Sequence, residues 1–126
     1  MSQAEIHFTQ DHEWVRLEED TAVIGITSFA TEELGEIVYV ELPTVENQLT
    51  QGQEFGVVES VKTVSSLFSP VTGTVEEINQ TLQDAPNMLN DDPYENGWML
   101  KVKMSDTTEI GDLMTQSEYD TFLSTQ

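Results

Sequence analysis

The sequence predicts a mainly β protein, an all-β sandwich or small barrel of short antiparallel strands with two short helices added. The first observation is that most of the chain consists of short β-prone runs separated by turn residues. The second is its length of 126 residues, which suits one compact domain and is too short for two ordinary ones. No long linker or low-complexity segment interrupts it, so we expect a single domain over residues 1–126.

The N-terminal part of the chain predicts a β-hairpin followed by a helix. Residues 13–17 alternate between polar and apolar side chains, and after a polar turn residues 21–26 supply the second strand. Residues 28–34 predict a short helix, because the Thr-Ser pair at 27–28 can cap its start. Gly35 can end this helix in the left-handed conformation.

The middle of the chain predicts further strands and two loops. A strand is expected over residues 36–42, where Pro43 ends it, and a loop over 47–52. Residues 84–97 are dense in Pro, Asn and Asp, which predicts loop or turn. Further strands are expected at residues 55–58, 64–68, 74–78 and 98–104.

The C-terminal segment predicts a second helix near residues 116–124. Thr115 and Glu118 match the T-x-x-E capping box, in which each side chain bonds the other residue's backbone N–H. The apolar residues that would share one side of this helix are Tyr119, Phe122 and Leu123.

The chain is strongly acidic. It has 4 Lys and Arg against 24 Asp and Glu, a formal net charge of −20. This disfavours nucleic acid and an anionic membrane surface as partners, because both require cations on the protein. It favours partners with basic docking faces, which opposite charge would steer toward the protein. High solubility or a salty environment is the alternative reason for such acidity.

Several classes of site find no support in the residues. The absence of cysteine excludes disulfides, zinc thiolate sites and thiol nucleophiles. His12 lies between Asp11 and Glu13, but successive strand side chains point to opposite faces, so we expect no metal site. No catalytic motif is present, and no acid–base pair can be singled out among so many carboxylates, so we predict no catalytic residue. The first ten residues lack the features of a signal peptide.

One lysine stands out from the acidic chain. Lys62 is the only cation between Arg16 and Lys101, and it lies between two β-prone runs. A hairpin tip here would place its side chain in water, as a target for covalent modification, a docking charge or an ordinary surface lysine. Amine catalysis is disfavoured, because the nearby Glu59 stabilises the ammonium form.

The segment around this lysine, VESVKTVSSLFSPVTG, resembles the prosthetic-group attachment region of glycine cleavage system H proteins. The family pattern places a glutamate three residues before the modified lysine and a glycine eleven residues after it. Here these are Glu59 and Gly73. Three further segments resemble the family in the same order, and together the matches cover most of residues 7–104. These segments are DHEWV, IGITSFATEELGEIVYVELP and LNDDPYENGWMLKVKM.

The resemblance implies a fold and a function. The fold would be a barrel-sandwich hybrid of the lipoyl/biotinyl-carrier kind, a single lipoyl-carrier domain with lipoic acid joined to Lys62 by an amide bond. The chain would be a non-catalytic carrier whose arm accepts an aminomethyl group from glycine decarboxylase and delivers it to the tetrahydrofolate-dependent aminomethyltransferase. Dihydrolipoamide dehydrogenase would then reoxidise the arm. A lipoyl ligase or transferase would attach it, in the bacterial cytoplasm or, for a mature eukaryotic chain, in the mitochondrial matrix.

The resemblance also assigns roles to residues near the lysine. Glu59 and Gly73 become recognition features for the modifying enzyme, although turn geometry would also account for either. A cleft should protect the cargo of the arm from water, and Glu13 is proposed near it, with a solvent-facing strand glutamate as the alternative. Ser66 is the second candidate for this cleft, at a position where many relatives carry aspartate. Thr63 stands where the family usually has alanine.

Three other interpretations compete with the H protein. A lipoyl domain of a 2-oxo acid dehydrogenase complex usually has aspartate before the lysine and hangs on a flexible linker, whereas here Val61 precedes Lys62 and no linker is present. A biotin carrier would have methionines beside its lysine. From a different class, an unmodified adaptor protein could use the acidic surface alone for binding.

Overall fold

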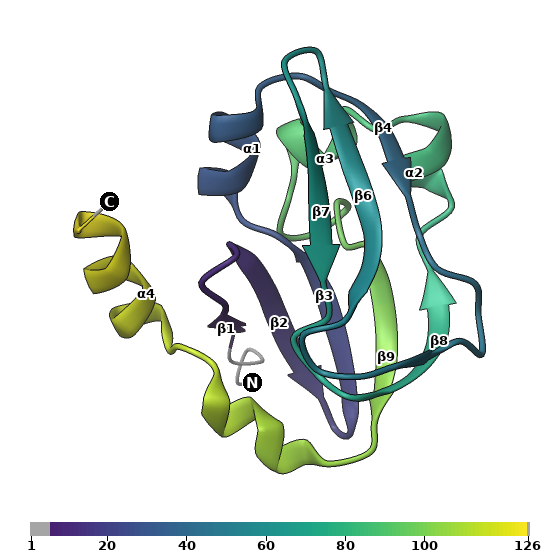
Figure 1. Cartoon of the computed structure of the whole chain (residues 1–126), viewed down its shortest axis with the longest axis vertical. Helices are drawn as coiled ribbons and strands as arrows, with labels where there is room; N and C mark the ends of the chain where they lie inside the picture. The colour runs from purple at the N-terminus through teal and green to yellow at the C-terminus, as the bar shows by residue number, and fades with distance from the viewer. Residues whose placement is uncertain (1–5, 126) are drawn as a thin grey trace.

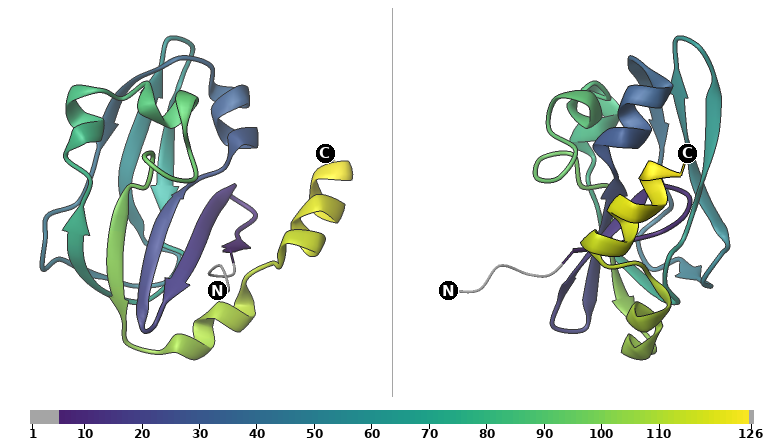
Figure 2. Two further views of the ribbon diagram at one scale, coloured as in Figure 1. Left: turned by 180° about the vertical axis from the view of Figure 1, so that it is seen from behind. Right: turned by 90° about the vertical axis from the view of Figure 1, so that its left-hand side faces the viewer.

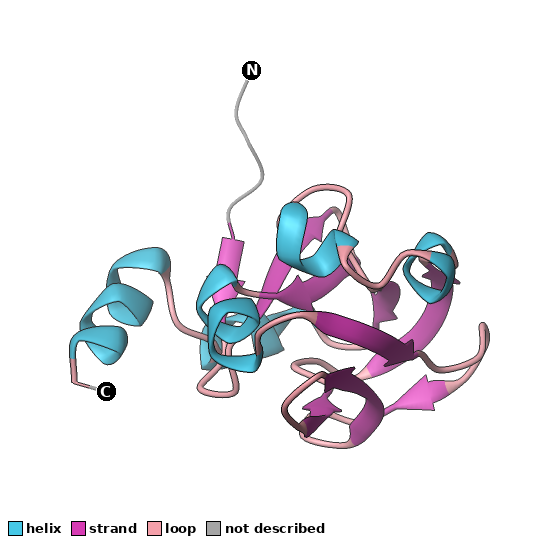
Figure 3. Ribbon diagram, turned by 90° about the horizontal axis from the view of Figure 1, so that it is seen from above, coloured by secondary structure: helices cyan, strands magenta, loops and turns pink. Residues whose placement is uncertain are grey.

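The computed structural model describes residues 6–125, in which short strands form the centre and helices lie around them (Figure 1) (Figure 3). The strands are β1 Ile6–Phe8, β2 Glu13–Glu18, β3 Thr21–Ile26, β4 Ile37–Glu41, β5 Gln48–Leu49, β6 Glu54–Ser60, β7 Val64–Phe68, β8 Gly73–Ile78 and β9 Leu100–Met104. The helices are α1 Ser28–Leu34, α2 Thr81–Asp84, α3 Met88–Asp91, the 3₁₀ helix η1 Thr107–Asp112 and α4 Gln116–Ser124.

Two antiparallel sheets make up the fold. The larger sheet has the order β1-β2-β3-β9-β8-β5, and the smaller has the order β4-β6-β7. The predicted hairpin is β2 and β3, which pair from Glu13 with Ile26 to Glu18 with Thr21. The prediction of a mainly β fold of short antiparallel strands is therefore confirmed.

The main hydrophobic core contains residues from both sheets. Val15 and Ile24 from the larger sheet and Val58 and Leu67 from the smaller one belong to one buried cluster. In the smaller sheet Val40 pairs with Val58, which pairs with Ser65, so these three share the inner face. Residues one position along each strand therefore lie on the outer face.

Helix α1 connects the larger sheet to the smaller one, between β3 and β4 (Figure 1). The Thr27 hydroxyl oxygen accepts a hydrogen bond from the Ala30 N–H, so Thr27 caps the helix. At the other end Gly35 has φ of 82° and its N–H donates to the Thr31 carbonyl. The positions of both ends match the sequence prediction, but Gly35 has ψ of −153° and is not in the left-handed helical conformation expected. The glycine is still required because this φ strains other residues.

Helix α4 lies at one side of the molecule beside β1 (Figure 2). The predicted capping box is present, since Thr115 accepts from the Glu118 N–H and the Glu118 side chain accepts from the Thr115 N–H. Tyr119 is buried in a second apolar cluster with Phe8, and Phe122 and Leu123 pack against it. The predicted apolar side of this helix is therefore the side that contacts the rest of the protein.

The structure differs from the sequence prediction in two loops. Residues 84–97 contain the one-turn helix α3, and α2 ends where this segment begins. Each of these helices buries one leucine, Leu82 and Leu89, so they are stabilised by packing that a local pattern does not reveal. Within 47–52, Gln48 and Leu49 form the short strand β5, which pairs with the start of β8.

Candidate functional site

Lys62 lies at the tip of the hairpin formed by β6 and β7, which projects from one end of the molecule (Figure 1). The Ser60 N–H donates to the Thr63 carbonyl at 2.8 Å, and the Ser60 hydroxyl oxygen accepts from the N–H groups of Lys62 and Thr63 at 3.1 Å each. The Val61 N–H donates to the Glu36 carbonyl at 3.1 Å. These bonds hold the exposed lysine on an ordered turn.

The lysine side chain crosses the end of α1. A Cβ on Gly35 would come within 3.2 Å of Lys62 Cε, so the missing side chain leaves room for the lysine stem. Three ion pairs occur within residues 6–125, and Lys62 takes part in none of them. The amine is therefore exposed and free of a carboxylate partner in the part of the chain that the structure describes.

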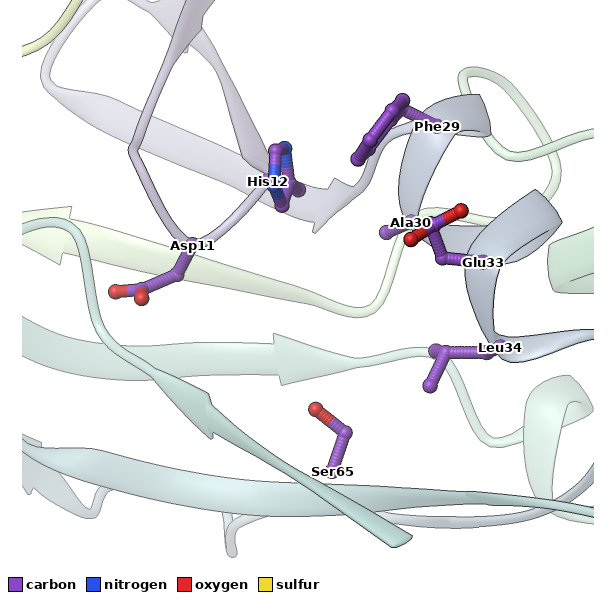
Figure 4. Close-up of a pocket in the computed structure, with 7 residues that line it drawn as sticks. All are labelled: Asp11, His12, Phe29, Ala30, Glu33, Leu34 and Ser65. Atoms are coloured by element: carbon purple, nitrogen blue, oxygen red, sulfur yellow. The ribbon is translucent and has the colours of Figure 1, made fainter. Parts of the chain in front are cut away.

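A cavity of about 410 Å³ opens between α1, the turn before β2 and strand β7 (Figure 4). Leu34 adjoins Gly35, and Ser65 is three residues from Lys62, so the cavity lies beside the tip end of the lysine hairpin. Its lining residues are Asp11, His12, Phe29, Ala30, Glu33, Leu34 and Ser65.

The cavity is apolar on one wall and acidic at its rim. Phe29, Ala30 and Leu34 provide the apolar surface, whereas Asp11 and Glu33 carry exposed carboxylates. Burial lowers the pKa of His12, and the nearby charges of Asp11 and Glu33 oppose this effect. The cavity therefore has a negative rim that suits a cationic group.

Side chains distant in the sequence hold both ends of α1. At its start, the Tyr119 hydroxyl lies 2.8 Å from the Thr27 hydroxyl, and the Tyr94 hydroxyl accepts from the Ser28 N–H at 3.1 Å. At its end, the Asn90 side-chain amide donates to the Gly35 carbonyl at 2.8 Å. The position of this cavity wall is therefore set by three side chains from other segments.

Sequence reasoning missed these three supporting residues. Asn90 and Tyr94 belong to the segment LNDDPYENGWMLKVKM, and the resemblance gave this segment no role near the lysine. Tyr119 was predicted only as part of an apolar helix side. No local pattern indicates that these side chains reach α1, because the contacts span between 55 and 92 residues of chain.

Glu13 lies between the sheets rather than in water. It is 1% exposed, its Oε2 accepts from the Phe68 N–H at 2.8 Å and its Oε1 accepts from the Thr9 hydroxyl at 3.3 Å. Burial raises its pKa to about 8, with a smaller contribution from Asp11, while the two hydrogen bonds act in the opposite direction. The alternative of a solvent-facing glutamate is wrong, and Glu13 is not among the residues that line the cavity.

Ser66 also lies away from the cavity. It is exposed and pairs with Val57 on the outer face of the smaller sheet, whereas Ser65 beside it lines the cavity. Successive strand residues point to opposite faces, so these two serines cannot share a role. The cavity-lining residue on this strand is therefore Ser65.

The two proposed recognition residues occupy different environments. Glu59 is half-buried on the outer face, paired with Tyr39 and Val64. Gly73 is buried at the start of β8, and a Cβ there would collide with the Lys103 carbonyl oxygen. Close packing against β9 explains this glycine without a modifying enzyme.

Residues 6–125 contain neither a metal site nor a membrane-spanning helix. No group of three or more His, Cys, Asp or Glu is placed to hold a metal ion. In particular, His12 lines the cavity while Glu13 lies between the sheets. None of the helices in this range has the length and apolar character to cross a membrane.

Comparison with known proteins identifies the family. The sequence profile described as "Glycine cleavage H-protein" matches residues 6–126. The glycine cleavage system H protein of Brevibacillus brevis is 53% identical over 115 residues, which are 91% of each chain. A probable glycine cleavage system H protein of Haloarcula marismortui is 49% identical over 115 residues, again 91% of each chain.

A solved structure supports the same assignment. The crystal structure of a glycine cleavage system H protein from Mycobacterium marinum matches with a TM-score of 0.89 and 36% identity, covering 98% of this chain and 99% of that one. The three competing interpretations, the dehydrogenase lipoyl domain, the biotin carrier and the unmodified adaptor, are not supported. The chain belongs to the glycine cleavage H-protein family, whose members are lipoyl-carrying shuttles in glycine cleavage.

Proposed function

We propose that Lys62 carries lipoic acid in amide linkage and that the chain shuttles this arm between the enzymes of glycine cleavage. The observation that carries the proposal is an exposed lysine, unpaired among the described residues, on a turn held by Ser60 and beside a cavity with a negative rim. Loading would convert the ammonium of Lys62 into a neutral amide. The ordered hairpin would give the long lipoyl arm a fixed attachment point about which it can move.

The residues around Lys62 fit a covalently attached arm. The amine is free of a carboxylate partner within the described residues, and the stem passes over Gly35 without obstruction. When bound, the lipoyl group would supply a disulfide that takes up the aminomethyl unit of glycine as the disulfide is reduced. The absence of cysteine from the chain is consistent with this chemistry, since a free thiol could exchange with that disulfide.

The cavity beside the hairpin is proposed as the shelter for the cargo. An aminomethyl cargo carries a cationic amine, and Asp11 and Glu33 place two carboxylates at the rim. Phe29 and Leu34 supply an apolar wall that excludes water. We assign the shelter to these residues and to Ser65 in place of Glu13 and Ser66.

The partners follow from the family and from the charge. The proposed enzymes are glycine decarboxylase, the tetrahydrofolate-dependent aminomethyltransferase and dihydrolipoamide dehydrogenase, with a lipoyl ligase or transferase for attachment. The chain itself would be a non-catalytic carrier. The net charge of −20 favours fast, reversible docking on basic surfaces. The proposed location is the bacterial cytoplasm, or the mitochondrial matrix for a mature eukaryotic chain.

Intact-mass measurement after incubation with lipoic acid, ATP and a lipoyl ligase tests the attachment site. The wild-type chain should gain the mass of one lipoyl group. Lys62→Arg should gain nothing, whereas the control Lys101→Arg should be modified as the wild type is, because Lys101 lies on β9 and pairs with Glu77. Modification of Lys62→Arg would rule out Lys62 as the attachment site.

The same material tests the function. The lipoylated chain should stimulate glycine–bicarbonate carbon exchange by purified glycine decarboxylase, and Lys62→Arg should not. Equal exchange rates with the two proteins would reject the shuttle function.

A further inference from the structure

Tyr119 of helix α4 joins two walls of the cavity through its hydroxyl group. This group lies 2.9 Å from His12 Nδ1 and 2.8 Å from the Thr27 hydroxyl oxygen. The ring is 3% exposed and stacks on Phe8 at a centroid distance of 4.4 Å. His12 lines the cavity directly, and Thr27 caps α1, which forms the opposite wall.

The direction of these hydrogen bonds follows from the available donors. The Thr27 hydroxyl oxygen already accepts from the Ala30 N–H at 3.2 Å, and Thr27 is fully buried. Its hydroxyl hydrogen therefore needs an acceptor, and among the described residues only the Tyr119 oxygen is in reach. The Tyr119 hydroxyl hydrogen is then left to donate to His12 Nδ1. This arrangement requires a neutral His12 with its hydrogen on Nε2.

His12 depends on this bond for its orientation. Its backbone has φ of 66°, in the left-handed region, and its ring lies near two phenylalanines, with centroid distances of 4.5 Å to Phe29 and 5.8 Å to Phe122. The aromatic neighbours limit the ring position but bond neither of its two nitrogens. Within residues 6–125, only the Tyr119 hydroxyl hydrogen-bonds to one of them, Nδ1. Asp11 and Glu33 are the charged groups near the ring.

We propose that Tyr119 is a positioning residue for the cavity beside Lys62. Its hydroxyl fixes the tautomer and orientation of His12 on one wall and supports the Thr27 cap on the other, so the C-terminal helix sets the shape of the shelter. The hydrogen bonds from Thr27 to Tyr119 and from Tyr119 to His12, which we call the relay, do not depend on whether the chain carries a lipoyl arm. The effect of the relay on the cargo rests on the proposed function.

Nitrogen-15 NMR of the full-length, unmodified protein tests the relay. At a pH where His12 is neutral, the wild type should show the Nε2–H tautomer, and Tyr119→Phe should show a mixture with the Nδ1–H form. The matched control is Tyr39→Phe, which removes an exposed tyrosine hydroxyl from β4 and should leave His12 unchanged. An Nδ1–H tautomer in the wild type overturns the proposal, whether or not the variant folds.

Amide hydrogen exchange tests the support of α1 in the same proteins. Tyr119→Phe should speed exchange at Thr31 and Gly35 by about ten-fold, the loss expected from one hydrogen bond. Amides of β3 should change much less. Unchanged exchange at both amides would overturn the proposal, because the Tyr119 hydroxyl would then give no support to the Thr27 cap of α1.

A third measurement connects the relay to the shelter. Lipoylated wild type and Tyr119→Phe are loaded by glycine decarboxylase, and ammonia release without aminomethyltransferase is followed over time. The variant should release ammonia several-fold faster, and Tyr39→Phe should match the wild type. Equal rates in a variant with an altered tautomer would overturn the positioning role. Failure to load even the wild type would instead reject the proposed function and leave the relay intact.

Discussion

Glu13 is a carboxylic acid held between two sheets, and its ionisation opposes folding. Two hydrogen bonds, from the Phe68 N–H and the Thr9 hydroxyl, favour the carboxylate. Burial has the larger effect and raises the pKa to about 8. The folded protein therefore keeps a neutral acid here at a pH where the unfolded chain has already released this proton.

Replacing Glu13 should remove part of the pH dependence of stability. A raised folded pKa contributes stability that is fully present below the unfolded value of 4.5 and is lost as pH rises through about 8. As the pH rises from below 4.5 to above 8, the unfolding free energy of the wild type should fall by about 3–5 kcal/mol relative to that of Glu13→Gln. Urea unfolding at about pH 5 and about pH 9 measures the shift. A constant difference would contradict a buried neutral acid.

Substitution of Gly73 can distinguish close packing against β9 from recognition by the modifying enzyme as the reason for a glycine at this position. Gly73→Ala should lower the unfolding free energy by more than about 3 kcal/mol, because a Cβ collides with the backbone of β9 at Lys103, which cannot move aside as a side chain can. The control is Gly111→Ala, where nothing lies within 4 Å of the new Cβ. A stable Gly73→Ala protein that only loses lipoylation would instead support recognition.

Single residues show which parts of the site the sequence can predict. Lys62 is predicted as the attachment site because it is an isolated cation in an acidic chain and because its motif is specific. Alternation along β7 implies that Ser65 and Ser66 face opposite ways, but the sequence does not say which of them faces the cavity. That depends on the pairing of β6 with β7 and on the position of α1. The burial of Glu13 also depends on how the two sheets pack, so the sequence alone leaves a solvent-facing glutamate open as an alternative.

The Ser60 side chain holds the turn of the β6–β7 hairpin that carries Lys62. Ser60→Ala would remove the acceptor for the N–H groups of Lys62 and Thr63, leaving both to water. The unfolding free energy should fall by about 1 kcal/mol, and the lipoylation rate should fall a few-fold, because the attachment point becomes less ordered. Ser66→Ala on the same hairpin is the control, as Ser66 is exposed. Equal lipoylation rates in both variants would show that the turn geometry is unimportant.

Elements were predictable where their signal is local. Seven strands, β2–β4 and β6–β9, follow from β-prone or alternating runs, and α1 and α4 follow from their caps, Thr27 and the Thr115–Glu118 box. The sequence does not predict β1. Helices α2 and α3 have no side-chain cap and only one turn each, so the composition of residues 84–97 predicts loop. Strand β5 exists through its pairing with β8. Long-range pairing of this kind leaves no periodic pattern in a short segment.

The large negative net charge destabilises the folded protein through repulsion and should attract partners with basic surfaces. Three ion pairs occur within the described residues, at Arg16, Lys101 and Lys103, and their partners are exposed. Exposed pairs of this kind contribute about 0–1 kcal/mol each. They offset little of the repulsion expected from a net charge of −20.

Salt should therefore act in opposite directions on stability and on partner binding. Raising NaCl from about 0.02 M to about 1 M shortens the screening length several-fold, so repulsion among the carboxylates weakens and the unfolding temperature should rise. The same screening should slow association with glycine decarboxylase, whose docking surface we expect to be basic. Thermal unfolding and stopped-flow association over one salt series measure both effects.

Near the sequence pI of about 4.1 the stabilisation by salt should disappear, because the net charge is then close to zero. KCl at equal ionic strength should reproduce both results, since screening depends on ionic strength and not on the identity of the cation. An unfolding temperature that falls with salt would show that the ion pairs matter more than the repulsion, and association that speeds up would exclude a basic docking surface.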